Sequence, residues 1–288
     1  MIKKGIILAA GTGSRLSPLT KSINKQLLPI YDKPLIFYPL SILMQNDIKN
    51  ILIIVNKGQV DQFKKILPIK NNLGIKIQYK EQIKPAGLPD AFLIGKNFIK
   101  NDNVVLILGD NFFYSRNIRK TYFKNIKFKN GANILLCPVK KPQLYGVAKI
   151  NKKNKVLEMI EKPKNPKSNL AITGLYIFDK NVVNYSKLLK PSKRNELEII
   201  DLLKIYQKKG ELTAKKINKD VNWLDAGSVK DLSLASQLVK NVEKIKGKKI
   251  GCLEEIALKN KWINKQKIIK SIKFYGNCDY SRYLKSLI

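Results

Sequence analysis

Near its start the chain reads Gly5-Ile6-Ile7-Leu8-Ala9-Ala10-Gly11-Thr12-Gly13-Ser14-Arg15-Leu16, an apolar run that leads directly into a glycine-rich turn. The apolar run predicts a buried strand, and the small residues after it let backbone N–H groups approach phosphate oxygens closely. Arg15 adds a cation that can hold a phosphate chain through paired hydrogen bonds. A plain tight turn is the alternative, because the stretch has neither the three-glycine spacing of dinucleotide binders nor a P-loop ending.

Strand-like apolar runs and helical patterns alternate along the first half of the chain. Strands are predicted at residues 51–55, 75–79 and 104–108, and helices at residues 34–45, 61–67 and 88–98. Such β-α-β alternation predicts a parallel, doubly wound α/β sheet. The second half is more mixed, with strands predicted at residues 132–138, 147–150, 174–178 and 212–217, and a helix at residues 195–207. We therefore expect a main α/β domain at residues 1–240 and a helical C-terminal segment at residues 241–288.

The overall composition fits a folded protein of ordinary size. The chain has 288 residues, of which 44% are hydrophobic, enough to bury a sizeable core. No apolar stretch approaches the roughly 20 residues that a membrane helix needs. The apolar run at residues 6–10 is also shorter than the core of a secretory signal, which spans about 7–15 residues. The sequence therefore predicts a cytoplasmic protein without a membrane partner.

Two features of the composition restrict the chemistry. The sequence contains no histidine, which excludes His-based general-base catalysis and His–metal sites. Its three cysteines, Cys137, Cys252 and Cys278, lie far apart and match no metal-binding spacing, so we expect reduced, structural thiols. Any chemistry must use carboxylates, lysines, arginines or a metal that is held by oxygen.

The formal net charge of +35 raises the question of nucleic-acid binding. Aromatic and basic residues alternate at residues 111–130, as on a platform that stacks single-stranded bases. The apolar residues of this stretch, however, also recur at the spacing of an amphipathic helix: Ile118, Tyr122, Phe123 and Ile126. Lysines are spread through nearly every segment rather than gathered in one block, so we favour a lysine-rich composition without a specific nucleic-acid partner.

A second motif follows the glycine-rich turn after one short loop and reads Lys25-Gln26-Leu27-Leu28-Pro29-Ile30-Tyr31-Asp32-Lys33-Pro34-Leu35-Ile36. Together the two motifs resemble the signature of the sugar nucleotidyltransferases, and most closely that of the glucose-1-phosphate thymidylyltransferases. The resemblance covers nearly the whole chain and includes, in order, Tyr38-Pro39-Leu40-Ser41, Leu108-Gly109-Asp110-Asn111, Tyr145-Gly146-Val147, Glu161-Lys162-Pro163, Pro166-Lys167-Ser168-Asn169, Thr173-Gly174-Leu175-Tyr176, Glu196-Leu197-Glu198-Ile199 and Trp223-Leu224-Asp225. It implies the Rossmann-like, doubly wound mixed sheet of the nucleotide-diphospho-sugar transferases, with a small C-terminal helical piece.

The resemblance implies the transfer of a thymidylyl group from dTTP to α-D-glucose 1-phosphate, which gives dTDP-glucose and pyrophosphate on the route to dTDP-rhamnose. The protein must then align two polyanions and neutralise the charge that develops between them. Arg15 and Lys25 resemble the family residues that hold the triphosphate and the departing pyrophosphate. Lys162 and Arg194 resemble those that hold the sugar phosphate.

The same resemblance implies a metal site and the contacts to base and sugar. Asp110 and Asp225 resemble the family's Mg²⁺ ligands, and Mg²⁺ favours one or two carboxylates with phosphate oxygens and waters. The residues implied to bind the nucleotide are Leu8, Ala10, Gly11, Thr12, Gly13, Ser14, Arg15, Gln26, Gln82, Gly87 and Asp110. Those implied to bind the sugar phosphate are Asn111, Tyr145, Gly146, Glu161, Lys162, Ile172, Tyr176 and Arg194. Arg15, Lys25, Asp110 and Lys162 are the candidate catalytic residues, whereas Tyr176 and Trp223 fit core aromatics equally well.

Several positions depart from the family pattern and leave the selectivity open. Lys84-Pro85-Ala86 stands where an acidic residue commonly precedes Gly87, and Leu144 replaces the usual basic residue before Tyr145. The same chemistry with UTP or another sugar 1-phosphate is therefore an alternative, and a non-catalytic relative that binds nucleotides or nucleic acid is a second. The segment at residues 252–257 resembles the part of the family that shapes an interface and a regulatory nucleotide site. A homotetramer is implied by the resemblance alone.

Overall fold

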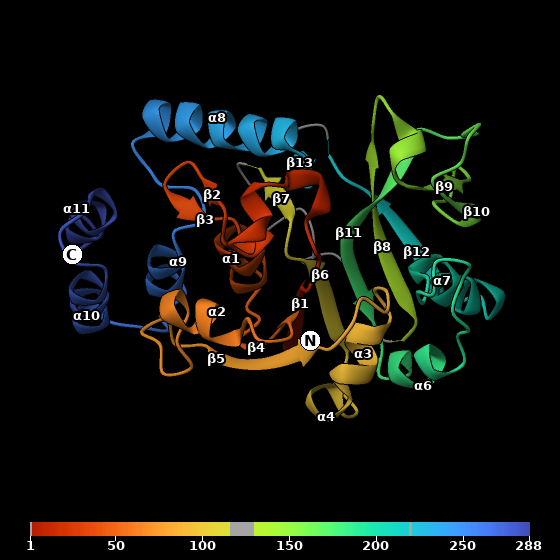
Figure 1. Cartoon of the computed structure of the whole chain (residues 1–288), viewed down its shortest axis with the longest axis horizontal. Coiled ribbons are helices and arrows are strands. Elements are labelled where there is room, and N and C mark those ends of the chain that lie inside the picture. Colours follow the sequence, from red (N-terminus) through yellow and green to blue (C-terminus); the bar gives the residue numbers. More distant parts are fainter. Residues whose placement is uncertain (1, 116–129, 219–220) are drawn as a thin grey trace.

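A computed structural model describes residues 2–115, 130–218 and 221–288. Its main feature is a nine-stranded sheet in the order β10-β9-β11-β6-β1-β4-β5, in which β8 also pairs with β11 and β12 (Figure 1). The predicted fold class, a doubly wound mixed α/β sheet, is confirmed. Most of the basic and aromatic stretch at residues 111–130 lies outside the described residues, including the positions at which a helical spacing was noted.

The parallel half of the sheet comes from the N-terminal part of the chain. It consists of β1 (Lys4–Ala9), β4 (Asn50–Asn56), β5 (Lys76–Gln82) and β6 (Val104–Leu108). Strand β1 lies between β4 and β6 and pairs with both in parallel. Its core side chains are covered on both faces, which explains the unbroken apolar run of the sequence.

Helices cover the two faces of this half through separate apolar clusters. Ile7 and Ala9 belong to a cluster with helices α1 (Phe37–Gln45) and α2 (Val60–Ile66). Ile6 and Leu8 belong to a cluster that includes the short helices α3 (Asp90–Ile94) and α4 (Lys96–Ile99). Because successive strand residues point to opposite faces, this division confirms helices on both sides of the sheet.

The remaining strands form the antiparallel half. Strand β11 (Leu170–Phe178) pairs antiparallel with β6 and with β8 (Ala132–Pro138), and β12 (Leu212–Lys216) pairs in parallel with β8. Strands β9 (Gly146–Ile150) and β10 (Val156–Glu161) form a hairpin at this end. Helices α6 (Val182–Lys187) and α7 (Ile199–Lys208) contribute to the second cluster.

Three helices predicted from the sequence have different bounds in the structure. The helix expected at residues 34–45 begins at Phe37, because Lys33–Pro34 forms strand β3, which pairs with β2 (Pro29–Ile30). The helix expected at 88–98 is divided at Gly95 into α3 and α4. The helix expected at 195–207 begins only at Ile199, since Glu198 has an extended backbone. This last difference leaves Glu196, Leu197 and Glu198 outside the helix.

Short elements connect the sheet to the C-terminal part. A ribbon of β7 (Asn111–Tyr114) and β13 (Asn222–Asp225) continues from the end of β6. Single 3₁₀ turns lie at η1 (Ser14–Leu16), η2 (Leu19–Lys21), η3 (Lys25–Leu27) and η4 (Pro142–Leu144). The long helix α8 (Val229–Lys246) then crosses residue 240, the domain boundary expected from the sequence.

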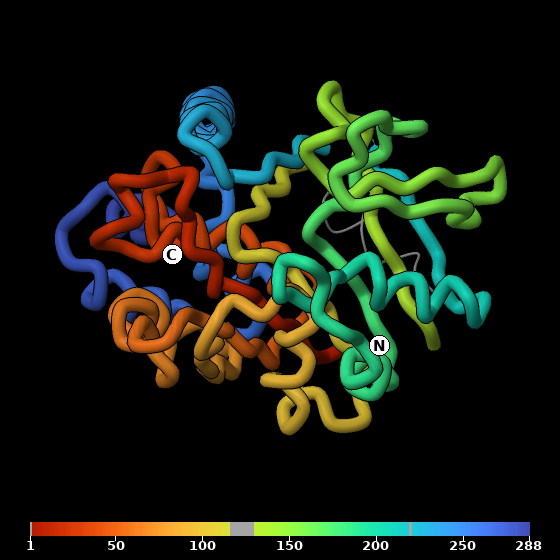
Figure 2. The backbone as a smooth tube through the Cα atoms, turned by 45° about the vertical axis from the view of Figure 1, so that its right-hand side comes forward, coloured from red at the N-terminus to blue at the C-terminus, as the bar shows by residue number. Residues whose placement is uncertain are grey.

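The C-terminal helices gather beside the N-terminal segment, at the end of the molecule opposite β9 and β10 (Figures 1 and 2). They are α9 (Leu253–Lys259), α10 (Lys265–Tyr275) and α11 (Asp279–Lys285). Helix α9 joins the cluster around α1 through Leu253 and Ala257, while α10 and α11 pack around Ile268 and Leu284 in a smaller cluster that also includes Cys252. No helix in the described parts of the chain combines the length and apolarity that crossing a membrane requires.

One buried carboxyl group joins these C-terminal helices. Glu254 on α9 is 1% exposed and accepts a hydrogen bond from the Tyr280 hydroxyl on α11 at 2.7 Å. Burial raises the pKa of this carboxyl above its ordinary value of 4.5, although the hydroxyls around it lower the pKa in part. The folded protein therefore retains this proton at pH values where the unfolded chain has lost it.

The raised pKa of Glu254 gives a prediction for how the stability of the protein depends on pH. The contribution of Glu254 is complete below pH 4.5 and is lost as the pH rises through the folded-state pKa. Glu254→Gln should reduce the fall of the free energy of unfolding in that range, measured by urea denaturation at a series of pH values. Asp61→Asn, a change of an exposed α2 carboxylate, should leave the wild-type slope. An unchanged slope in Glu254→Gln would contradict this account.

Candidate active site

The glycine-rich turn lies where β1 ends at the carboxyl edge of the sheet, the edge at which open α/β sheets bind ligands. Gly13 has a left-handed backbone with φ of 67°, and a Cβ there would lie 2.8 Å from Cγ2 of Thr20. The Thr20 hydroxyl also donates to the Gly13 carbonyl at 2.9 Å. The turn therefore requires glycine at position 13 for two reasons, its backbone conformation and its contact with Thr20.

The second sequence motif lies against this turn. Lys25 is 7% exposed, and its ammonium group contacts the Asp110 carboxylate. A Cβ at Gly11 would lie 3.7 Å from the Lys25 ammonium, an ordinary contact distance. Asn24 holds the motif in place, because its side chain donates to the Ala9 carbonyl at 3.1 Å and accepts from the Gln26 backbone N–H at 2.8 Å. The structure thus brings the turn, Lys25 and Asp110 together.

Asp225 reaches the same place through the β7–β13 ribbon. In this ribbon Asp225 is paired with Asn111, the residue after Asp110. The Arg15 guanidinium lies 3.8 Å from the Asp225 carboxylate. Burial and the nearby Asp110 charge raise the pKa of Asp225 to about 6, opposed by Lys25 and Arg15. Burial also acts to raise the pKa of Asp110, but the contact with Lys25 lowers it on balance.

The two carboxylates suit a hard divalent cation. The described residues contain no group of three or more His, Cys, Asp or Glu side chains that could hold a metal by themselves. Mg²⁺ does not need one, since it is commonly bound by one or two carboxylates together with substrate phosphates and waters. The oxygen-only pair of Asp110 and Asp225, beside a turn suited to phosphate, fits that requirement.

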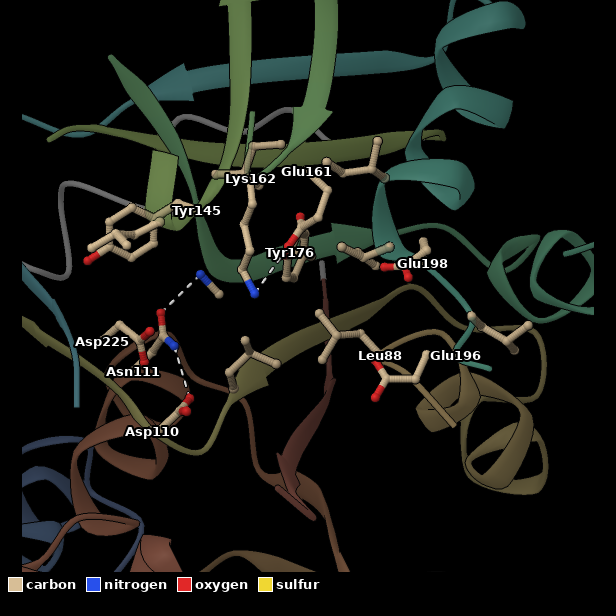
Figure 3. A pocket seen from close by; sticks show the side chains of 18 of the residues that line it. Leu88, Asp110, Asn111, Tyr145, Glu161, Lys162, Tyr176, Glu196, Glu198 and Asp225 are labelled. Carbon is tan, nitrogen blue, oxygen red and sulfur yellow. Dashed lines mark hydrogen bonds and ion pairs between the residues drawn. The ribbon is translucent and has the colours of Figure 1, made fainter. Parts of the chain in front are cut away.

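A pocket of about 270 Å³ opens beside this cluster (Figure 3). Asp110, Asn111 and Asp225 line one side, and Glu161 and Lys162 point into it from the antiparallel half of the sheet. All the residues implied to bind the sugar phosphate or the metal line it, together with Arg15: Asp110, Asn111, Tyr145, Gly146, Glu161, Lys162, Ile172, Tyr176, Arg194 and Asp225. Residues far apart in the sequence therefore meet around one cavity.

The wall opposite the carboxylates is built at the end of β10. Lys162 has φ of 43° although it precedes a proline, and its backbone N–H donates to the Tyr145 carbonyl at 3.0 Å. Its ammonium lies 3.8 Å from the Glu161 carboxylate. Burial raises the pKa of Glu161, and the charges of Lys162 and Arg194 oppose this rise. A left-handed backbone at a non-glycine residue is often found at functional sites, and here it turns Lys162 toward the cavity.

The structure also shows where Tyr176 and Trp223 lie, the two aromatic residues that fitted the hydrophobic core as well as the site. Tyr176 is 3% exposed and belongs to the apolar cluster around α7, but it lines the pocket as well. Trp223 lines the pocket and lies against Tyr145, with ring centroids 5.3 Å apart. Both side chains are thus packed structural residues that form part of the cavity wall.

The residues implied to bind the nucleotide lie mostly beside the pocket rather than in its lining. Among them, only Arg15 and Asp110 line it, whereas Leu8, Ala10, Gly11, Thr12, Gly13, Ser14, Gln26, Gln82 and Gly87 do not, and neither does Lys25. Gln82 ends β5 and is paired with Asn56, whose side-chain amide donates to the Gly11 carbonyl at 3.4 Å. The Gln82 amide donates to the Asp90 carboxylate at 2.8 Å.

Several pocket residues had no role assigned from the sequence. The extended segment before α7 contributes Glu196, Leu197 and Glu198, and further lining comes from Leu88, Leu108, Leu144, Gly174, Ile199 and Ile200. Glu198 accepts hydrogen bonds from Arg194 at 2.7 Å and from the Ser192 hydroxyl at 2.6 Å, which lower its pKa against the effect of burial. The ordered Glu196-Leu197-Glu198-Ile199 motif was the available signal, but a predicted helix there concealed its extended backbone.

Comparisons with known proteins agree with this arrangement. A profile of the family described as "Nucleotidyl transferase" matches residues 4–242. Proteins named glucose-1-phosphate thymidylyltransferase from Neisseria meningitidis and Mycolicibacterium smegmatis are 42% and 39% identical over 285 residues, covering 99% of this chain and 99% of each relative. This chain belongs to the nucleotidyl transferase family, and the resemblance noted in the sequence is confirmed.

Solved structures give the same result at the level of the fold. A Bacillus anthracis protein that bears the glucose-1-phosphate thymidylyltransferase name, solved with sucrose, aligns with a TM-score of 0.74 at 42% identity, over 82% of this chain and 94% of that protein. A UDP-glucose pyrophosphorylase solved with UDP-glucose aligns with a TM-score of 0.74 at 27% identity, over 84% of this chain and all of the other.

Gly87 gives a prediction about the coupling of two segments beside the pocket. It has φ of 91° and forms a backbone bridge with Leu197, whose carbonyl oxygen would lie 2.0 Å from a Cβ at position 87. Gly87→Ala should therefore push the two segments apart, costing on the order of 3 kcal/mol of stability from strain and displacement. The change is checked by denaturant unfolding together with a catalytic assay.

Gly58→Ala is the matched control for this variant. Gly58 also has a positive φ, of 77°, but a Cβ there would have no neighbour within 4 Å. It should cost only the backbone preference, about 1–2 kcal/mol, and leave activity unchanged. Equal effects of the two substitutions on activity would show that the bridge to Leu197 is unimportant.

Proposed function

We propose that this chain transfers a thymidylyl group from dTTP to α-D-glucose 1-phosphate, giving dTDP-glucose and pyrophosphate. The observation that carries the proposal is that each of two carboxylates lies close to a cationic side chain beside the glycine-rich turn. Lys25 contacts Asp110, and Arg15 lies near Asp225, beside a pocket whose other wall presents Glu161 and Lys162. Full-length relatives that carry the thymidylyltransferase name support the choice of substrates.

In the proposed reaction a phosphate oxygen of the sugar phosphate attacks the α-phosphorus of the triphosphate. The new bond joins that oxygen to the α-phosphorus, and the bond from the α-phosphorus to the bridging oxygen of the β-phosphate breaks. Pyrophosphate leaves with that electron pair. The attacking phosphate oxygen is already ionised at neutral pH, so the absence of histidine from the sequence is no obstacle.

Each of the two substrates would be bound by its own pair of cationic side chains. Lys162, which points into the cavity, and the largely exposed Arg194 would hold the attacking sugar phosphate. Arg15 and Lys25, beside the turn, would neutralise charge on the triphosphate and on the leaving pyrophosphate. Glu161 would accept hydrogen bonds from sugar hydroxyls. These residues bind and orient the reactants, and the main catalytic effect is charge stabilisation in a fixed geometry.

Asp110 and Asp225 are the proposed ligands of Mg²⁺. When bound, the ion would neutralise phosphate charge and orient the triphosphate. The nucleotidyl transferase family generally uses a divalent metal, and the choice of magnesium rests on the oxygen-only donors described above.

Base recognition is assigned to the segment after β5. Gln82 carries an amide that can pair with a pyrimidine edge through one donor and one acceptor, and Gly87 would let the base approach the backbone. Uracil presents the same edge, so UTP is the nearest competing substrate. The structural similarity to a UDP-glucose pyrophosphorylase is the specific observation that favours this second candidate.

Three further assignments complete the proposal. Residues 1–240 would form the catalytic domain, and residues 241–288 a helical segment that serves an interface or regulation. A homotetramer is proposed from the resemblance, and no specific nucleic-acid partner is proposed. A cytoplasmic location is supported by free thiols at Cys137, Cys252 and Cys278, as expected in a reducing compartment.

Substitution of the two aspartates tests the metal assignment. Asp110→Asn and Asp225→Asn should each retain the fold and lower kcat by about 100-fold or more, because each removes a proposed ligand of the cation that would stabilise the transition state. Pyrophosphate release with dTTP, glucose 1-phosphate and Mg²⁺ measures this loss. Asp201→Asn, which removes an exposed carboxylate on α7, is the control and should keep wild-type activity. Near-normal turnover in both site variants would refute the assignment.

Substrate choice is tested separately by pyrophosphate release across a matrix of nucleoside triphosphates and sugar 1-phosphates. The highest kcat/KM is expected for dTTP with glucose 1-phosphate. A clear preference for UTP would retain the reaction type and replace the nucleotide. Absence of pyrophosphate release with every pair would instead support a non-catalytic nucleotide-binding relative.

A further inference from the structure

We propose that Asn111 is a positioning residue, whose side-chain amide connects the carboxylate of Asp110 to the indole of Trp223. It would fix the orientation of a proposed metal ligand and of one pocket wall together. The inference rests on the proposed function, because it takes Asp110 to be a metal ligand. It adds to the sugar contact that the family resemblance implies for Asn111.

The amide of Asn111 is enclosed and its oxygen is fully used. The residue is 2% exposed and begins β7. Its Oδ1 accepts a hydrogen bond from the Gly174 backbone N–H at 3.0 Å and another from Trp223 Nε1 at 2.6 Å. An amide oxygen has two lone pairs, so these two donors satisfy it.

The orientation of this amide follows from its two donors. Because the oxygen faces Gly174 and Trp223, the nitrogen must face the other way, and it donates to Asp110 Oδ1 at 3.1 Å (Figure 3). The amide occupies the space that a side chain at position 174 would need, since a Cβ at Gly174 would lie 2.7 Å from three atoms of the amide group. A glycine on β11 therefore lets the amide pack directly against the strand.

Each carboxylate oxygen of Asp110 therefore has a partner that holds it in place. Oδ2 contacts the Lys25 ammonium, and Oδ1 accepts from Asn111. Partners that orient a metal ligand commonly affect metal affinity by about 10–100-fold. Lys25 is also proposed to hold phosphate, so Asn111 is the anchor that would remain when Lys25 turns to the substrate.

On the side of the pocket where the sugar would bind, Asn111 acts by holding Trp223. The indole N–H donates to Asn111, and its ring packs against Tyr145 with centroids 5.3 Å apart. Tyr145 and Trp223 both line the pocket. One buried amide thus joins the carboxylate side of the site to the aromatic wall, because its nitrogen donates to Asp110 and its oxygen accepts from Trp223.

Asn111→Asp separates these two functions because it keeps the accepting oxygen and removes the donor. We expect the binding of Mn²⁺ in the presence of dTTP to weaken by about tenfold or more, measured without turnover from the free Mn²⁺ signal in electron paramagnetic resonance. Asn151→Asp is the matched control. The oxygen of Asn151 also accepts two N–H hydrogen bonds, both from the backbone, at 2.9 and 3.0 Å, in a loop outside the pocket lining. It should bind Mn²⁺ like wild type.

Tryptophan fluorescence tests the second proposed role of Asn111, its hydrogen bond with Trp223. The chain has two tryptophans, so Trp262→Phe leaves Trp223 as the only tryptophan, which is excited selectively at wavelengths that tyrosine does not absorb. In that background Asn111→Asp should retain the emission maximum, whereas Asn111→Leu, which lacks the accepting oxygen, should shift it and increase quenching by acrylamide. A thermal melt establishes folding for each variant. If Asn111→Asp does not fold, Asn111→Ser decides the metal arm, because its short side chain cannot reach Asp110.

Two outcomes would overturn the inference. One is wild-type Mn²⁺ binding in Asn111→Asp together with a raised KM for glucose 1-phosphate, which would make Asn111 a sugar contact alone. The other is an unchanged Trp223 emission in Asn111→Leu. Failure of the proposed function is a different result: Asp110→Asn would then bind Mn²⁺ with dTTP as tightly as wild type.

Discussion

The buried contact between the Lys25 ammonium and the Asp110 carboxylate is the interaction on which the rest of the site depends. Their side chains are 8% and 15% exposed, and a charge so far removed from water is costly unless it is paired. Removal of either partner would leave the other charge buried alone. The pair also joins the motif after the glycine-rich turn to the end of β6, so the local structures that form the site must assemble together.

The strands that lie between other strands were predictable from the sequence, and so were the outer strands β5 and β12, but the outer strand β10 was not. Strands β1, β4 and β6 are covered on both faces and read as unbroken apolar runs. Strand β10 was missed because it is an outer strand with Leu157 half-exposed, Ile160 partly exposed and glutamates between the apolar residues. It pairs with β9 alone, as the outer strand of a hairpin.

The same distinction explains the site. Ordered motifs predicted that Asp110, Asp225, Glu161 and Lys162 belong together, and the fold brings them around one cavity. The motifs did not show that the side-chain oxygen of Asn111 accepts hydrogen bonds from Gly174 and Trp223, since hydrogen bonds between distant strands depend on register. Nor did they show that the chain before α7 is extended, because helical propensity continued into residues whose backbone is set by the bridge to Gly87.

That bridge has a consequence for how substrate preference can change. Leu88, next to Gly87, and Leu197 both line the pocket, and the Leu197 N–H donates to the Ala86 carbonyl at 2.9 Å. The segment after β5 and the segment before α7 are therefore joined through their backbones and cannot shift independently. If the first reads the base and the second faces the sugar, selectivity for donor and acceptor is a shared trait. Evolution or engineering that widens one specificity would then tend to relax the other.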